Sequence, residues 1–255
     1  MSEKTPFFTR ITRLFKITGW LFHAMSRVRK LENATLEQRN AELAALSAQA
    51  LTILNARLNS SGTSAETPGG LLIAANHISI LDIFAILSLC PCSFIAMQEL
   101  KRWPLVGRLA ANAGTVFIDR GNRKDVNVIN EAICLALEAG QNVCFFPESR
   151  TSSGSGILPF KAALFQSAID TGSDIQPVVL RYFDHCGRPS AAPSFSDVNL
   201  VVSMWRIVSM PSIEIRIDFL PRMKPQGDRY QVKDRVEEAV GSRVDRFLLT
   251  ETENR

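Results

Sequence analysis

Apolar and polar positions follow two different periods along the chain. Six short runs are apolar throughout or alternate strictly, as β-strands do: LLIAA (71–75), SFIAM (93–97), TVFI (115–118), NVCFF (142–146), IQPVVL (175–180) and IEIRIDF (213–219). Stretches with helical periodicity lie between them, near residues 80–89, 103–112, 125–139 and 160–170. This alternation predicts an α/β fold whose mainly parallel or mixed sheet is flanked by helices. In such sheets, ligands bind where strands end and loops begin.

The first 60 residues predict a pair of helices in front of this domain. At about 100° per residue, one arc of residues 7–30 is apolar and the opposite arc is basic. The apolar arc holds Phe7, Ile11, Leu14, Phe15, Leu21, Phe22 and Met25, and the basic arc holds Arg13, Lys16, His23 and Arg27. Residues 34–59 follow as a second helix, and the polar run NSSGTSAETPGG then breaks the pattern. We expect N-terminal helices in residues 1–60, a linker at 61–70 and the main domain at 71–255.

The first of these helices carries an excess of positive charge. The chain of 255 residues has a net charge of +4, yet its first 30 residues hold seven Lys or Arg and only one acidic residue, Glu3. The longest charge-free run, Ile17–Ser26, is about half the length that a bilayer crossing needs. This predicts a helix lying in the membrane interface, on the cytoplasmic face of the inner membrane. The alternative is a helix packed on the protein's own core.

Composition narrows the class of protein. Apolar residues make up 46% and charged residues 21%, which is typical of a globular domain. The five cysteines show no zinc-site spacing and no C-x-x-C, so we expect buried thiols in a reducing compartment. The chain lacks G-x-G-x-x-G, P-loop and G-x-S-x-G motifs, which removes the main support for nucleotide binding and serine hydrolysis. No pattern of basic and aromatic residues indicates nucleic-acid binding.

Two ionisable residues interrupt the apolar stretch LLIAANHISILDIFAIL (71–87). His77 and Asp82 would be about 140° apart on one regular helix and could not meet. They can meet if His77 lies in the turn after the strand and Asp82 lies in the first turn of the following helix. Ser79 would then be the N-cap, with Asp82 in capping-box spacing. The alternative is that Asp82 only caps the helix and His77 is an ordinary turn residue.

Charged clusters follow further strands, and together these segments carry a resemblance. Four segments resemble the glycerolipid acyltransferase family, the 1-acylglycerol-3-phosphate acyltransferases and their relatives, in the family's order. They are Asn76-His77-x-Ser79-x-x-Asp82, Gly114-x-x-Phe117-Ile118-Asp119-Arg120, Phe146-Pro147-Glu148-Ser149 and Pro177-Val178-Val179. The resemblance covers about residues 70–220, and the paired N-terminal helices are similar to those of bacterial members.

The resemblance implies transfer of a fatty acyl chain from acyl-CoA or acyl-carrier protein to the hydroxyl of a lysolipid. His77 would act as the general base and Asp82 would orient it, as in a hydrolase triad without its serine. Backbone amides near Asn76–Ser79 would stabilise the oxyanion. The acceptor hydroxyl replaces an enzyme nucleophile, so we expect no acyl-enzyme, and the chemistry requires no metal or cofactor.

The resemblance also implies a substrate-binding set. Arg120 is the expected phosphate ligand because a guanidinium binds phosphate through two bonds; its alternative is an ion pair with Asp119 or Asp125. Glu148 would hold an arginine or the acceptor hydroxyl, and its alternative is an ion pair with Arg150 that stabilises the turn. The full predicted set is Asn76, Arg120, Glu148, Ser149, Arg150 and Lys161. The alternative for Lys161 is that it only covers the helix that follows.

The match departs from the family at two points. The family commonly reads Phe-Pro-Glu-Gly-Thr-Arg-Ser, whereas residues 146–152 read Phe-Pro-Glu-Ser-Arg-Thr-Ser. Many members carry lysine before a Glu-Leu pair, whereas this chain has Met97 and Gln98. These changes weaken the case for a phosphate headgroup more than the case for acyl transfer. A different acceptor, such as a lyso-ornithine lipid, is therefore an alternative, and a non-catalytic membrane lipid-binding protein is another.

Overall fold

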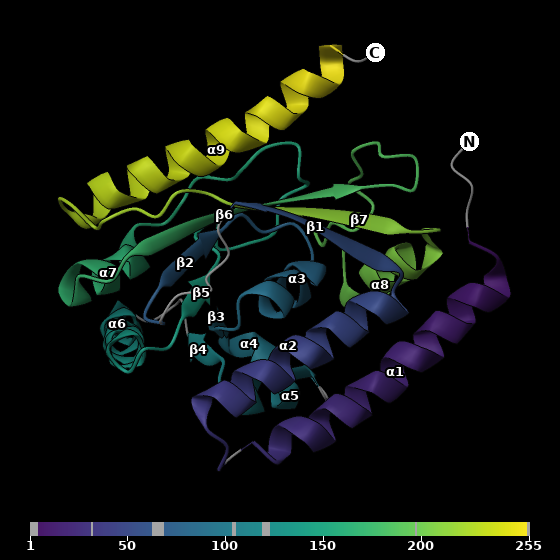
Figure 1. The fold of residues 1–255 in the computed structure, drawn as a ribbon, viewed down its shortest axis with the longest axis horizontal. Coiled ribbons are helices and arrows are strands. Elements are labelled where there is room, and N and C mark those ends of the chain that lie inside the picture. Colours follow the sequence, from purple (N-terminus) through teal and green to yellow (C-terminus); the bar gives the residue numbers. More distant parts are fainter. Residues whose placement is uncertain are drawn as a thin grey trace.

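A mixed β-sheet forms the centre of the computed structural model, which describes residues 5–31, 33–62, 69–103, 106–118, 123–196 and 198–253 (Figure 1). Within these residues, seven strands pair in the order β1-β7-β6-β2-β5-β3-β4. All neighbours are parallel except β6 and β7. The strands are β1 (Ala56–Gly62), β2 (Leu72–Ala75), β3 (Ser93–Met97), β4 (Val116–Ile118), β5 (Val143–Phe145), β6 (Ile175–Phe183) and β7 (Ile213–Phe219).

Helices cover both faces of this sheet. α2 and α3 lie on one side and α9 on the other, while α1 packs outside α2 (Figure 1). The α-helices described are α1 (Phe7–Arg29), α2 (Leu36–Ile53), α3 (Leu81–Leu89), α4 (Gln98–Lys101), α5 (Val106–Asn112), α6 (Arg123–Glu138), α7 (Gln166–Thr171), α8 (Leu200–Ser209) and α9 (Arg229–Glu253). A 3₁₀ turn, η1 (Ala163–Phe165), precedes α7. This arrangement confirms the predicted fold class.

The central strands contribute side chains to two separate hydrophobic cores, one on each face of the sheet. Successive side chains of a strand point to opposite faces, and β2 shows the consequence. Ile73 and Ala75 pack with α3 and the buried face of α8, whereas Leu72 and Ala74 pack with α6 and α9. β2 and β5 are buried along their whole length, as their continuous apolar runs predict. β6 is also buried throughout, although it contains Gln176 and Arg181.

The structure corrects the expected second helix. α2 ends at Ile53 rather than near residue 59, Asn55 adopts a left-handed conformation (φ 54°), and β1 follows and pairs with β7. The expected domain boundary at residue 60 therefore falls inside a strand of the main sheet. The sequence hid β1 because it is an edge strand with exposed polar residues, which weakens the apolar pattern of a strand. Of the expected linker, residues 63–68 lie outside the described part of the chain.

The first helix has two apolar faces. Trp20, Ala24 and Val28 are buried against α2, and the Trp20 indole donates to the Leu46 carbonyl oxygen (3.0 Å). Packing on the protein's own core, the alternative drawn from the sequence, therefore accounts for this face. Phe15 lies on the other side of α1 and is 76% exposed. No described helix is both long enough and apolar enough to span a bilayer.

Candidate active site

A side-chain amide fixes the turn after β2. Asn76 is buried; its Nδ2 donates to the Leu180 carbonyl oxygen (3.1 Å) and its Oδ1 accepts from the Leu180 amide (2.7 Å). These two bonds join the end of β2 to β6, its neighbour in the sheet. Asn76 was expected to bind substrate, but its amide group is used to hold the turn that carries His77.

Asp82, in the first turn of α3, is completely buried. Its Oδ2 accepts from His77 Nδ1 at 2.8 Å and from the amides of Ile78 and Ser79 at 2.7 and 2.9 Å. A buried carboxylate remains ionised only when such donors replace its water. Asp82 therefore meets His77 and also closes the turn before the helix, so the alternative in which it only caps the helix does not hold.

A tyrosine that the sequence did not single out gives Asp82 a fourth donor. The Tyr182 hydroxyl, on β6, donates to Asp82 Oδ1. Burial, and then the nearby Asp82 charge, raise the pKa of Tyr182 well above its usual value, so the phenol keeps its proton and acts as a donor. Ser79, the expected N-cap, accepts from the Leu81 amide through Oγ (3.3 Å), while Ile80 occupies the N-cap position.

The imidazole of His77 lies between Asp82 and a cavity. Its side chain is 20% exposed, lines that cavity, and stacks on Phe146 with ring centroids 3.9 Å apart. Because Nδ1 faces a carboxylate, the neutral ring carries its proton on Nδ1 and presents Nε2 as an acceptor. This is the arrangement of a general base held in one tautomer.

Residues 148–152 hold the backbone of His77 from both sides. Glu148 Oε1 accepts from the His77 amide (2.6 Å), and the Ser152 amide donates to the His77 carbonyl oxygen (2.7 Å). Glu148 Oε2 accepts from the Leu158 amide (2.7 Å). Both carboxylate oxygens of Glu148 thus bind main chain, and through these bonds Glu148 positions the backbone of His77.

Three amides of the turn where we expected the oxyanion site, near Asn76–Ser79, already have acceptors within the protein. The amide of His77 donates to Glu148, and the amides of the next two residues donate to Asp82. An amide has a single proton, so these three have none left for a substrate oxygen. The carboxylates that position His77 therefore use these three donors, and the oxyanion site near Asn76–Ser79 stays a prediction for the neighbouring amides.

An apolar cavity of about 740 Å³ opens beside His77. This volume falls in the range of about 300–1,000 Å³ that is usual for small-molecule sites. The helices that precede the sheet form one of its walls, since α1 and α2 contribute Trp20, Ala24, Val28, Leu43 and Leu46. A ligand that enters from His77 therefore reaches the N-terminal helices, which belong to the site as well as to the outer surface.

Two cations lie on the same cavity as His77. Arg150 and Lys161 both line it and are exposed, and neither forms an ion pair with a described residue. Ser149, also on the cavity, has a left-handed backbone (φ 65°), the conformation that glycine favours. Arg120, the expected phosphate ligand, lies outside the described residues.

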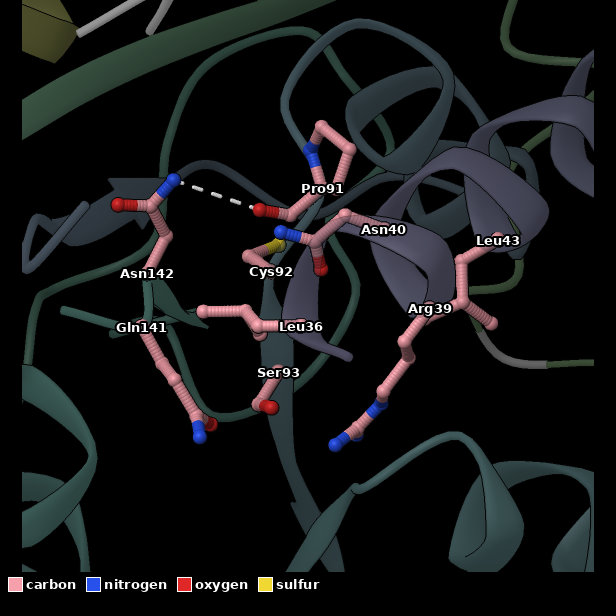
Figure 2. A pocket seen from close by; sticks show the side chains of 9 residues that line it. All are labelled: Leu36, Arg39, Asn40, Leu43, Pro91, Cys92, Ser93, Gln141 and Asn142. Carbon is pink, nitrogen blue, oxygen red and sulfur yellow. Dashed lines mark hydrogen bonds between the residues drawn. The ribbon is translucent and has the colours of Figure 1, made fainter. Parts of the chain in front are cut away.

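A second, small cavity adjoins the first. It measures about 10 Å³, space for about one water molecule. Figure 2 shows side chains of α2 facing the Pro91–Ser93 segment and Asn142, whose Nδ2 donates to the Pro91 carbonyl oxygen (3.3 Å). Leu43 and Cys92 line both cavities, so these two side chains separate them.

The described residues contain one group with metal-ligand character, Asp184–Cys186. It lies in a turn after β6 and does not line the large cavity. Asp184 already accepts from the Arg188 guanidinium (2.8 Å).

Several known proteins are similar to this chain. Residues 57–181 match the family model described as Acyltransferase. The chain is 48% identical, over 94% of both chains, to a 1-acyl-sn-glycerol-3-phosphate acyltransferase of Neisseria gonorrhoeae. It is 35% identical, over 71% of this chain and 69% of the other, to a lyso-ornithine lipid O-acyltransferase of Pseudomonas aeruginosa. The fold is similar to the crystal structure of a 1-acyl-sn-glycerophosphate acyltransferase from Thermotoga maritima, with a TM-score of 0.72 and 20% identity over 94% of this chain and 95% of that one.

Replacing Tyr182 by Phe tests the fourth donor to Asp82. The variant leaves Asp82 Oδ1 without that donor in a site closed to water, so we expect a loss of about 1–3 kcal/mol in the free energy of unfolding. Urea unfolding followed by circular dichroism measures this. The control is Tyr230→Phe at an exposed position, which should change stability by less than about 0.5 kcal/mol. Equal stability of the two variants would contradict the assignment.

The pH dependence of stability tests the burial of Glu148. Burial raises the pKa of Glu148 from 4.5 to about 7. The hydrogen bonds from the Leu158 and His77 amides lower this pKa, and the nearby Asp82 charge raises it further. The folded state therefore binds the proton more tightly, and this contribution to stability is lost as the pH rises from about 4.5 to 7. We expect the wild-type free energy of unfolding to fall across that window, by up to about 1.4 kcal/mol per pH unit relative to Glu148→Gln. Parallel curves for the two proteins would show that Glu148 does not titrate this way.

Proposed function

The chain belongs to the acyltransferase family, and we propose that it transfers a fatty acyl chain from an acyl thioester to the hydroxyl of 1-acylglycerol-3-phosphate at a membrane surface. The observation that carries the proposal is the His77–Asp82 pair beside an apolar cavity of about 740 Å³. The relative with 48% identity, which is named for this acceptor, supports the choice of lysolipid. The thioester donor is acyl-CoA or acyl-carrier protein.

The proposed reaction is a direct transfer. The neutral His77 Nε2 removes the proton of the acceptor hydroxyl as that oxygen attacks the thioester carbonyl carbon. The tetrahedral intermediate then expels the thiolate, and the imidazolium returns the proton to the sulfur. Asp82 stays ionised throughout and stabilises the imidazolium that forms between the two steps.

The cavity supplies separate places for the two ends of the substrates. Its apolar walls suit a fatty acyl chain, because each methylene moved out of water contributes about 0.8 kcal/mol. Arg150 and Lys161 suit the phosphate of the acceptor, since both lie on the cavity with His77 and carry no acidic partner among the described residues.

A lyso-ornithine lipid is the second candidate acceptor. The observation that favours it is the similarity to the lyso-ornithine lipid O-acyltransferase of Pseudomonas aeruginosa, together with the altered sequence after Glu148. The reaction at His77 would be the same, and only the headgroup contacts would differ. A lipid-binding protein without turnover is the third reading, and the intact His77–Asp82 pair argues against it.

We place the protein on the cytoplasmic side of the inner membrane, where acyl thioesters are made and lysolipids reside. α1 supports contact with a membrane, because Phe8, Phe15 and Phe22 recur every seven residues and are all exposed. Deletion of residues 1–30 would also remove Trp20 and its neighbours from the cavity wall. Membrane contact is therefore better tested by changes to exposed side chains.

Acyl transfer by His77 is tested with purified protein and a panel of acceptors. We expect release of thiol from acyl-CoA or acyl-carrier protein with 1-acylglycerol-3-phosphate, and a rate in His77→Ala that is lower by about 10²–10⁴. The matched control is His185→Ala, an exposed histidine away from the cavity, which should keep the wild-type rate.

Three other results would each change the conclusion. Turnover only with lyso-ornithine lipid would assign that acceptor instead. Lipid binding without turnover for every acceptor would support the non-catalytic reading. Full activity in His77→Ala would remove the proposed mechanism.

Leu43→Ala tests whether the cavity holds the acyl chain. This change removes part of the wall between the two cavities and lengthens the large one, so we expect the preferred thioester to shift to a longer chain. The control is Leu36→Ala, which alters the small cavity alone. Competition among thioesters of graded length gives the profile; identical profiles in both variants and wild type would place the acyl chain elsewhere.

A further inference from the structure

α8 carries an apolar face that the described part of the chain leaves partly exposed. Ile207 and Val208 of this helix are fully buried on the sheet, whereas Val201 is 77% exposed and Val202 and Trp205 are also exposed. The exposed three lie at i, i+1 and i+4, so they form one stripe. Contiguous apolar surface of this kind on a soluble domain marks a place where something binds.

The stripe on α8 continues onto α1. The Phe7 and Trp205 rings meet edge to face with centroids 6.4 Å apart, and Phe7 in turn meets Phe8 at 6.1 Å. Phe15 and Phe22 continue this face along α1 at intervals of seven residues. Of the eleven large hydrophobic side chains exposed in the described residues, seven belong to these two helices. We call this the α1/α8 surface: Phe7, Phe8, Phe15, Phe22, Val201, Val202 and Trp205.

Hydrogen bonds hold the two helices in a fixed relation. The Arg13 guanidinium, from α1, donates to the carbonyl oxygens of Met210 (2.6 Å) and Pro211 (3.0 Å), where α8 ends. The Thr5 amide donates to the Ser209 carbonyl oxygen (3.1 Å). Figure 1 shows α8 beside the N-terminal end of α1. The two helices are therefore fixed relative to each other, so a partner that contacts one of them can contact both.

The charges around this surface select its partner. Neither helix contains an acidic residue, while Arg10, Lys16 and Arg206 are among their basic residues. Arg10 lies over the Trp205 ring, 5.7 Å from its centroid. Aromatic side chains flanked by cations suit the interface of an anionic bilayer, where the rings enter the acyl boundary and the cations meet headgroups.

We propose that α8 is a second membrane-contacting helix, and that the α1/α8 surface lies in the interface of an anionic lipid bilayer. The inference deepens the proposed function, since it rests on the protein working at a membrane. It adds an element about 190 residues away in sequence to the N-terminal helix. Contact at two helices fixes the rotation of the protein on the membrane, which a single helix would leave free.

Flotation with vesicles of phosphatidylethanolamine and phosphatidylglycerol tests the proposal. We expect Val201→Ser/Trp205→Ser to weaken vesicle binding at least tenfold, Phe15→Ser/Phe22→Ser to weaken it by a similar factor, and the combined variant to be weaker than either. The matched control is Val128→Ser/Leu135→Ser on α6, which changes two exposed apolar residues (63% and 68%) away from this surface and should bind as wild type does.

Two measurements keep the outcome decisive. Thermal unfolding checks that the double variant is folded, and Val201→Glu tests the same stripe through a single exposed position. Acyl transfer to a short-chain lysolipid dispersed without vesicles is followed in parallel. Wild-type vesicle binding in both α8 variants overturns the proposal. If the wild-type protein transfers no acyl chain to the dispersed acceptor, the proposed function is overturned. The vesicle-binding result would still test the α1/α8 surface.

Discussion

One buried negative charge organises the centre of this protein. The Asp82 carboxylate has no exposed surface, and it is stable there because four donors surround it: the His77 ring, two backbone amides and the Tyr182 hydroxyl. These donors come from the turn after β2 and from β6, so the same charge fixes the turn, the helix that follows and the direction of the imidazole. Glu148 and Ser152 then hold the His77 backbone from the opposite side.

The polar groups and the apolar cavity of the site lie on different parts of the fold. The polar groups lie where β2 ends and the 148–152 segment begins, and the apolar cavity extends from there to α1 and α2. In the proposed reaction, the fatty acyl chain thus reaches His77 from the apolar cavity, and the charged headgroup reaches it from the polar side. Because α1 lines the cavity on one side and exposes phenylalanines on the other, the same helix connects the site to the proposed membrane surface.

Much of this could be predicted from the sequence where a local pattern carried the information. The runs 93–97 and 213–219 became β3 and β7 with the expected bounds. The spacing of His77 and Asp82 allowed their pairing, and the family motifs favoured it. The comparisons confirm the resemblance to the acyltransferases.

The remainder depends on contacts between distant residues. Tyr182 lies 100 positions from Asp82, so no local motif reveals it. The role of Asn76 depends on Leu180 in the neighbouring strand, and β1 is a strand because β7 lies beside it. α9 did leave a signal that we did not use, since Val232, Val236, Val240 and Val244 recur every four residues and are all buried.

The most direct test of this account is the protonation of the His77 ring, measured by ¹⁵N NMR above its titration range. The chain has three histidines, so a variant in which the other two are replaced by glutamine isolates the signal. The account predicts a proton on Nδ1, facing Asp82, and a bare Nε2. A neutral ring with its proton on Nε2 would contradict it, because the nitrogen offered to the substrate would then have no lone pair to accept a proton.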